Sequence, residues 1–186
     1  MNRIKIFAWV GIIGAIVMIV FGSNALIAPP QIGNRVVNPG LFQVKNILEI
    51  IGFVGYAMIC FAFYRKGAAG HGWLAKIGLG FALLGAITAS VINIANAIAI
   101  QNVDTPDWAN IFLFGLVLLA PVLLGIGALR TRMIVLWQAL YPILIVGFLA
   151  ITIWIIVGDA NPSIPAIFQA FAWIGFALIA IKVKPK

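Results

Sequence analysis

Five polar side chains within otherwise apolar stretches of this 186-residue sequence could together bind a solute. They are Asn24, Glu49, Asn93, Asn96 and Gln169. Amides carry both hydrogen-bond donors and acceptors, and a carboxylate can hold a cation or a proton. Polar groups at membrane depth are costly and usually have a partner or a purpose. We therefore expect these five residues to line a binding pocket for a small polar solute.

A structural role is the alternative interpretation of the same side chains. Amides on neighbouring transmembrane helices can hydrogen-bond to one another, at about 0.6 kcal/mol each. Glu49 would then form an ion pair with Lys45, which lies one helical turn earlier. The sequence leaves both interpretations open, and they differ in whether the amides face a cavity or one another.

The sequence lacks the residue combinations on which most catalytic and metal sites depend. His71 is the single histidine and Cys60 the single cysteine, so neither a bis-histidine haem site nor a cysteine–histidine zinc site can be assembled. A serine–histidine–aspartate triad would need His71 on the side of the membrane opposite every aspartate. No phosphate-binding glycine motif is present. We therefore expect a protein that is not an enzyme and that holds no cofactor and no metal.

The composition indicates that lipid surrounds most of the chain. Apolar residues make up 64% and charged residues 9% of the sequence, and the mean hydropathy is +1.16. A soluble domain has about 45–50% apolar and about 25% charged residues. The net charge of +8 does not indicate a nucleic-acid partner, because the basic residues are spread over several short segments. The expected partner of these charges is the lipid bilayer, whose anionic headgroups attract them.

Six apolar stretches are each long enough to cross the hydrocarbon layer as a helix, which takes about 17–25 residues. They are residues 6–28, 47–64, 77–100, 109–129, 133–157 and 164–181. Strands of a membrane barrel would be about half as long and would alternate polar with apolar residues. We predict a single all-α domain over residues 1–186, a six-transmembrane-helix bundle. Residues 29–46, which contain prolines and glycines, would form an external loop.

The basic residues set the expected orientation of this bundle. If the N-terminus is cytoplasmic, ten basic residues and no acidic residue lie in cytoplasmic segments. The external segments then hold only Arg35 and Lys45, together with all four acidic residues. Short cytoplasmic loops are enriched in lysine and arginine. We therefore expect a multi-pass protein of the cell membrane (plasma or inner) with both termini in the cytoplasm.

Small residues recur every four positions along residues 77–100. One side carries Gly78, Ala82, Ala86 and Ser90 together with Gly85, Ala89, Asn93 and Ala97, and the other carries Leu83, Ile87, Val91, Ile94 and Ile98. Small residues let helix backbones approach closely in lipid, so we expect the small side to pack within the bundle and the large side to face lipid. Gly11, Gly14 and Ala15 form a shorter patch of the same kind.

These features favour a small-solute binding or transport component with an outward-facing polar pocket. Residues 29–46 would lie above this pocket, as a lid or as a passive tether. A chain of this size has little material for transport on its own, so we expect a homo-oligomer or a larger membrane complex. The alternative is a non-catalytic assembly, immunity or accessory subunit, whose small-residue side would receive a helix of another protein.

Overall fold

The part of the protein that the structure describes is helical apart from one very short hairpin. The computed structural model describes residues 3–27, 31–32, 35–102, 107–131 and 163–182. Its helices are α1 (Arg3–Ile27), α2 (Pro39–Arg65), α3 (Trp73–Ala99), α4 (Asp107–Arg130) and α7 (Ser163–Lys182). Strands β1 (Gln31–Ile32) and β2 (Arg35–Val36) pair antiparallel between α1 and α2. Within the described residues, three helical segments are long and apolar enough to cross a membrane: Arg3–Val20, Pro39–Arg65 and Trp73–Ala99.

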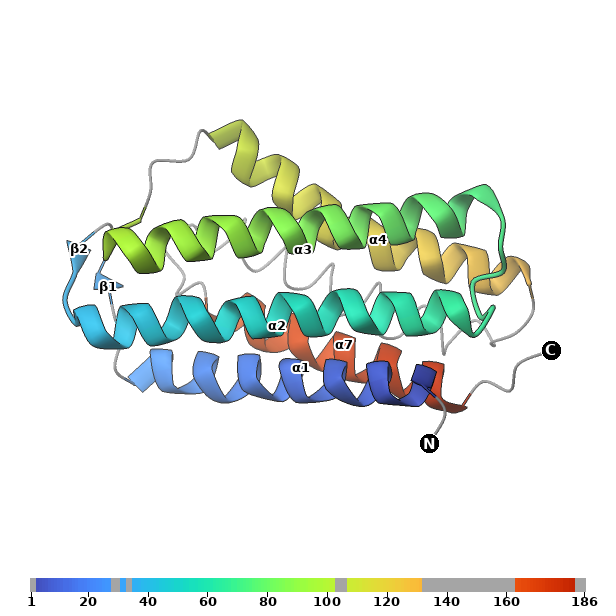
Figure 1. The fold of residues 1–186 in the computed structure, drawn as a ribbon, viewed down its shortest axis with the longest axis horizontal. Helices are drawn as coiled ribbons and strands as arrows, with labels where there is room; N and C mark the ends of the chain where they lie inside the picture. The colour runs from blue at the N-terminus through green and yellow to red at the C-terminus, as the bar shows by residue number, and fades with distance from the viewer. Residues whose placement is uncertain (1–2, 28–30, 33–34, 103–106, 132–162, 183–186) are drawn as a thin grey trace.

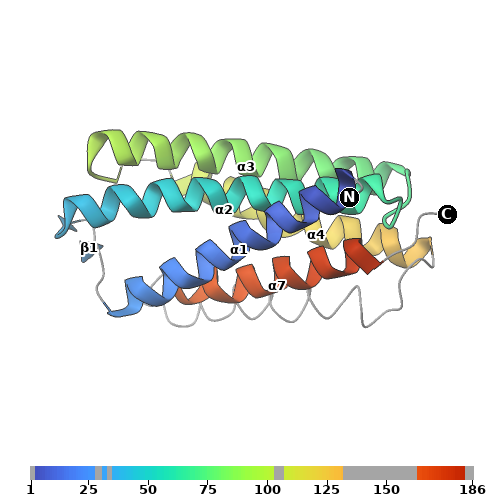
Figure 2. The ribbon, with the colours of Figure 1, turned by 60° about the horizontal axis from the view of Figure 1, so that its bottom comes forward.

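The described helices lie side by side along one long axis (Figures 1 and 2). α2 packs against both α1 and α3, α4 packs against α3, and α7 packs against α1 and α2. The strands and the start of α2 lie at one end of the bundle, which we call the hairpin end. α1 begins and α7 ends at the opposite end, which we call the terminal end. The start of α1 and the end of α7 therefore lie at the same end of the bundle.

Helix α2 begins earlier than its hydropathy predicts. It starts at Pro39 instead of residue 47, so the prediction of a loop over residues 29–46 is wrong for its second half. Asn38 caps the helix, since its side chain accepts a hydrogen bond of 3.0 Å from the Leu41 amide. Proline at the first helical position adds to this start signal because it has no amide to leave unpaired. The other described helices begin and end within a few residues of their predicted bounds, and the predicted helix 133–157 lies outside the described residues.

The small residues of α3 are buried and its large residues are exposed on the opposite side, as their spacing predicts. The small residues Gly78, Ala82, Gly85, Ala86, Ala89 and Asn93 are buried, whereas Leu83, Ile87, Val91, Ile94 and Ile98 are exposed. A Cβ atom added to Gly78 would lie 3.0 Å from the Ala120 carbonyl oxygen of α4. The small side therefore lets the backbone of α3 approach that of α4 closely.

Glycines also form the contact between α1 and α2. A Cβ atom on Gly14 would lie 3.0 Å from the Ile51 carbonyl oxygen and 3.1 Å from the Gly55 Cα atom. A Cβ atom on Gly55 would lie 3.1 Å from the Gly14 Cα atom. The predicted small patch of α1 thus meets a second small patch, on α2, and the two backbones touch where the helices cross.

A tyrosine joins α2 to α4 at the proline of α4. Pro121 has no amide hydrogen, so the carbonyl of Val117, four residues earlier, lacks its usual intrahelical donor. The Tyr56 hydroxyl donates a hydrogen bond of 2.8 Å to that carbonyl. The Tyr56 ring also stacks on Trp173 of α7, with centroids 4.6 Å apart. Tyr56 therefore links three helices, and its partner Trp173 is a core residue.

Candidate functional site

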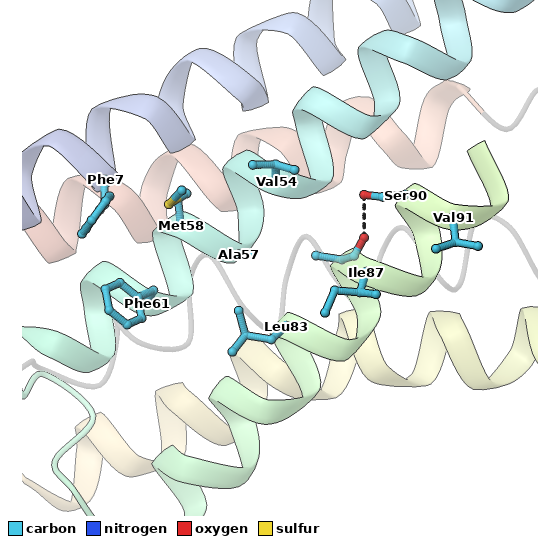
Figure 3. Close-up of a pocket in the computed structure, with 10 residues that line it drawn as sticks. Phe7, Val54, Ala57, Met58, Phe61, Leu83, Ile87, Ser90 and Val91 are labelled. Atoms are coloured by element: carbon cyan, nitrogen blue, oxygen red, sulfur yellow. Dashed lines mark hydrogen bonds between the residues drawn. The ribbon is translucent and has the colours of Figure 1, made fainter. Parts of the chain in front are cut away.

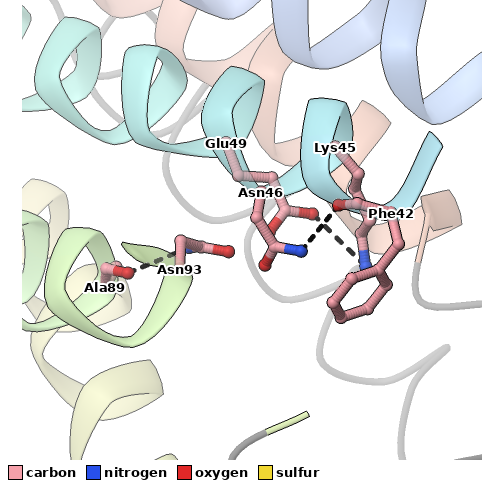
Figure 4. Close-up of polar contacts among 6 residues, drawn as sticks. All are labelled: Phe42, Lys45, Asn46, Glu49, Ala89 and Asn93. Carbon is pink, nitrogen blue, oxygen red and sulfur yellow. Dashed lines mark hydrogen bonds and ion pairs between the residues drawn. The ribbon is translucent and has the colours of Figure 1, made fainter. Parts of the chain in front are cut away.

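Two buried amides and a carboxylate lie between α2 and α3 toward the hairpin end. Asn46 of α2 is 2% exposed and Asn93 of α3 is 6% exposed, and Glu49 lies three residues after Asn46 on α2. Figure 4 shows the Asn46 and Asn93 side chains pointing toward each other across the contact between the two helices. We call Asn46, Glu49 and Asn93 the amide–carboxylate cluster.

Both amides of this cluster bond to the backbone of their own helix. Asn46 Nδ2 donates a hydrogen bond of 2.8 Å to the Phe42 carbonyl, and Asn93 Nδ2 donates one of 2.9 Å to the Ala89 carbonyl. A carbonyl oxygen only accepts, so these bonds identify which end of each amide is nitrogen. One N–H of each amide is therefore held by its own helix backbone, and the amide oxygen and the second N–H remain for other partners.

The Glu49 carboxylate of the cluster forms an ion pair with a lysine of the same helix. Lys45 Nζ lies 3.6 Å from Glu49 Oε1, and the two side chains are 17% and 24% exposed. This is the ion pair that the four-residue spacing predicts. Glu49 is therefore sheltered from solvent yet still within reach of a mobile ammonium group.

The structure brings together only part of the predicted site. Glu49 and Asn93 belong to the cluster, and Asn96 lies one turn further along α3, where it is half-buried. Asn24 lies on α1 and Gln169 on α7, but their side chains are outside the described ones. The alternative interpretation expected Asn93 to bond to an amide of another helix, whereas its Nδ2 donates to the Ala89 carbonyl of the preceding turn.

Two polar residues of α2 were missed as site residues because they were assigned to the loop. Asn46 is one, and Gln43 is the other, with Nε2 donating a hydrogen bond of 3.1 Å to the Ala97 carbonyl near the end of α3. The signal that could have found them is the pair Asn38–Pro39, a cap followed by proline at the first helical position. A helix begun there carries Asn46 about 10 Å inward, at 1.5 Å per residue.

The part of the chain that the structure describes holds few other groups that could bind a metal or take part in a reaction. No group of three or more histidine, cysteine, aspartate or glutamate residues comes together there. No buried side-chain nitrogen or oxygen lacks a hydrogen-bond partner among these residues. Among these residues the amide–carboxylate cluster offers two amide oxygens, one carboxylate and the second N–H of each amide nitrogen.

Comparison of the whole chain with protein-family models, with curated proteins and with solved structures gives no match.

Proposed function

We propose that this protein is a non-catalytic component for binding or transporting a small cationic solute, and that the solute binds at the amide–carboxylate cluster. The observation that carries the proposal is the direction of the two buried amides. One N–H of each amide is taken by the Phe42 or Ala89 carbonyl, and Figure 4 shows the Asn46 and Asn93 side chains directed toward each other, with Glu49 on the same helix as Asn46. A site that combines amide oxygens with a carboxylate favours a ligand that brings donors and positive charge.

The ion pair between Lys45 and Glu49 supports a cationic ligand over an anionic one. The Lys45 ammonium already lies 3.6 Å from the carboxylate, so the geometry accommodates a positively charged nitrogen. An ammonium group on a solute could replace the tethered one, since lysine is flexible and its head can move to solvent. Binding would then exchange one cation for another and leave no buried charge unpaired.

The proposed setting is a six-helix bundle of the cell membrane with both termini in the cytoplasm. The charge distribution supports this orientation, because ten of the twelve basic residues fall in the segments that would be cytoplasmic. The hairpin end would then be external. At 1.5 Å per residue, Asn46 and Glu49 lie about 10 and 15 Å from the start of α2, and Asn93 about 9 Å from the end of α3. A solute would reach the cluster from outside.

The alternative role as an accessory subunit has less support. It relied on the small-residue side of α3 receiving a helix of another protein. That side is buried within the chain, where Gly78 and Gly85 face residues of α4. A partner or a second copy would therefore have to bind elsewhere on the surface.

Thermal unfolding of the detergent-purified full chain tests the proposal. Sodium, potassium, methylammonium and tetramethylammonium ions form the cationic panel, with neutral and anionic solutes of similar size for comparison. A ligand at 100 times its dissociation constant stabilises the folded state by about 2.7 kcal/mol. We expect a cation to raise the melting temperature of the wild type and not that of Glu49→Gln, and Asn93→Ala to weaken the effect.

The exposed amide of Gln101, just beyond the end of α3, provides the matched control. Gln101→Ala removes an amide near the same end of the bundle and should retain the full response. The proposal is wrong if no cation stabilises the wild type. It is also wrong if the Glu49→Gln protein responds as strongly as the wild type.

A further inference from the structure

A second feature of the molecule, separate from the amide–carboxylate cluster, is an open groove along the contact between α2 and α3. Its volume is about 510 Å³, within the range of about 300–1,000 Å³ that ligand pockets occupy. Figure 3 shows residues of α2 and α3 along its length and Phe7 of α1 at one end. Its surface is almost entirely apolar.

The groove presents almost no polar surface to an occupant. Ser90 carries the one hydroxyl among its lining residues, and this hydroxyl donates a hydrogen bond of 2.7 Å to the Ala86 carbonyl (Figure 3). Ile87 and Val91, on the rim, are 61% and 60% exposed. These residues belong to the side of α3 that the sequence assigns to lipid. An occupant of the groove is therefore a hydrocarbon chain, because any polar group placed there would lack a partner.

Each of the three helices that line this groove carries a basic residue between the groove and the terminal end of the bundle. On α1, Arg3 lies one turn before Phe7, and on α2, Arg65 lies one turn after Phe61. Residues four apart share a helix face, and Phe7 and Phe61 meet edge to face with centroids 5.5 Å apart. The two arginines therefore lie on the same faces as the aromatic pair that closes the groove, one turn further out.

The third basic residue comes from α3. Lys76 lies seven residues, or two turns, before Leu83, which lines the groove, so the two share one stripe of the helix. Arg3, Arg65 and Lys76 are all exposed. Among the described residues of the terminal end there is no acidic side chain to neutralise them.

We propose that this groove binds an anionic phospholipid, with one acyl chain along α2 and α3 and the phosphate headgroup held by Arg3, Arg65 and Lys76. The apolar length and the basic end match the two parts of such a lipid. Basic residues clustered at a membrane surface attract anionic headgroups, and arginine can bind a phosphate through two parallel hydrogen bonds.

Lipid titration of the delipidated full chain in detergent tests this inference. Native mass spectrometry would count bound molecules of dioleoyl phosphatidylglycerol and of dioleoyl phosphatidylcholine, which differ in headgroup charge but not in chains. We expect tighter binding of phosphatidylglycerol. Arg3→Gln and Arg65→Gln should each weaken it about fivefold, the effect of one basic residue near a membrane surface, and leave phosphatidylcholine unchanged.

Matched variants distinguish binding in the groove from the general effects of losing a positive charge or adding a large side chain. Lys5 is exposed on α1 but lies two residues from Phe7, on the other side of the helix, so Lys5→Gln should leave binding unchanged. Ala57→Phe, which fills the groove, should weaken both lipids, whereas Leu84→Phe, outside the groove, should weaken neither. If the Ala57→Phe protein does not fold, Ser90→Leu replaces it, with folding checked by circular dichroism.

Five outcomes would overturn the inference, four of them from measurements with lipids or of the oligomeric state and one from a phosphate control. The wild type could bind the two lipids equally, or Lys5→Gln could have an effect as large as that of Arg3→Gln. Lipid binding could also be unchanged after the groove is filled, or the protein could form a lipid-independent dimer that contacts through the groove. Inorganic phosphate has the charge without the chains and should not displace the lipid. Displacement by phosphate would show that the headgroup site acts without the groove, which also contradicts the inference.

Discussion

Helix α2 contacts its neighbours in two different ways. Toward α1 it presents glycines, and the backbones of the two helices touch at Gly14 and Gly55. Toward α4 and α7 it presents Tyr56, whose hydroxyl bonds to the Val117 carbonyl and whose ring stacks on Trp173. The first contact depends on the absence of side-chain atoms, and the second depends on one particular side chain.

This difference teaches how the bundle gains specificity without a hydrophobic driving force between helices. In lipid, helices associate through close backbone contact and through hydrogen bonds. The glycine contact leaves little room for an added atom, because the nearest neighbours of Gly14 and Gly55 are backbone atoms. The tyrosine contact should respond in a graded way, since its hydroxyl and its ring can be changed separately. The predictions below test this difference, from the largest expected effect to the smallest.

The largest effect is expected from Gly14→Leu. A Cβ atom there would lie 3.0 Å from the Ile51 carbonyl oxygen, so α1 and α2 would have to move apart. We expect a loss of about 3 kcal/mol, at the upper end of the usual cost of overpacking. Unfolding by sodium dodecyl sulfate in mixed micelles measures it. Gly80→Leu is the control, because a Cβ atom on Gly80 meets nothing within 4 Å. Equal losses in both variants would contradict the glycine contact.

The next effect concerns the hydrogen bond of Tyr56. Tyr56→Phe keeps the stacked ring but leaves the Val117 carbonyl without its donor, so we expect a loss of about 1.5 kcal/mol. In a Pro121→Ala background the restored amide of residue 121 supplies a donor to that carbonyl. Tyr56→Phe should therefore cost much less in that background. A double-mutant cycle of unfolding free energies measures the coupling. An equal loss in both backgrounds would show that the hydroxyl does not compensate for the proline.

The two contacts also differ in how far the sequence predicts them. The sides of α3 were predicted correctly because small and large residues separate at a local, helical spacing. The patch at Gly11 and Gly14 was visible for the same reason. Its partner at Gly55 and the pairing of Tyr56 with Val117 were not, since both depend on which helices become neighbours. The stacking of Trp173 on Tyr56 likewise depends on α7 lying against α2.

The site was predicted less well because hydropathy alone located the helix starts. Gln43, Lys45 and Asn46 lower the hydropathy of the first turns of α2, so those turns were assigned to the loop. The capping pair Asn38–Pro39 contains the missing information and is independent of hydropathy. Glu49 and Asn93 were proposed as site residues because they interrupt apolar stretches. The bonds from the amide nitrogens of Asn46 and Asn93 to the preceding helical turn are seen only in the structure.

A smaller effect tests the start of α2 that positions Asn46. Asn38→Ala removes the side chain that accepts from the Leu41 amide, and we expect a loss of about 1 kcal/mol. Asn38→Asp keeps the cap and adds a favourable charge at the helix N-terminus, so it should be neutral or stabilising. Thermal unfolding of the two variants in the same detergent gives the comparison. If Asn38→Ala and Asn38→Asp unfold alike, the cap does not determine where α2 begins.

The smallest structural effect is expected at the ion pair of Lys45 and Glu49. The lysine precedes the glutamate by four residues, the weaker of the two orientations, so Lys45→Gln should cost about 0.3 kcal/mol. Its effect on binding should be larger and opposite in sign. Without the tethered ammonium, the carboxylate is open to a cation, and the thermal shift that a cation produces should increase. Glu49→Gln has the same small cost but should abolish the shift. If both variants respond to cations as the wild type does, the ion pair has only a structural role within α2, and the proposed cation site is wrong.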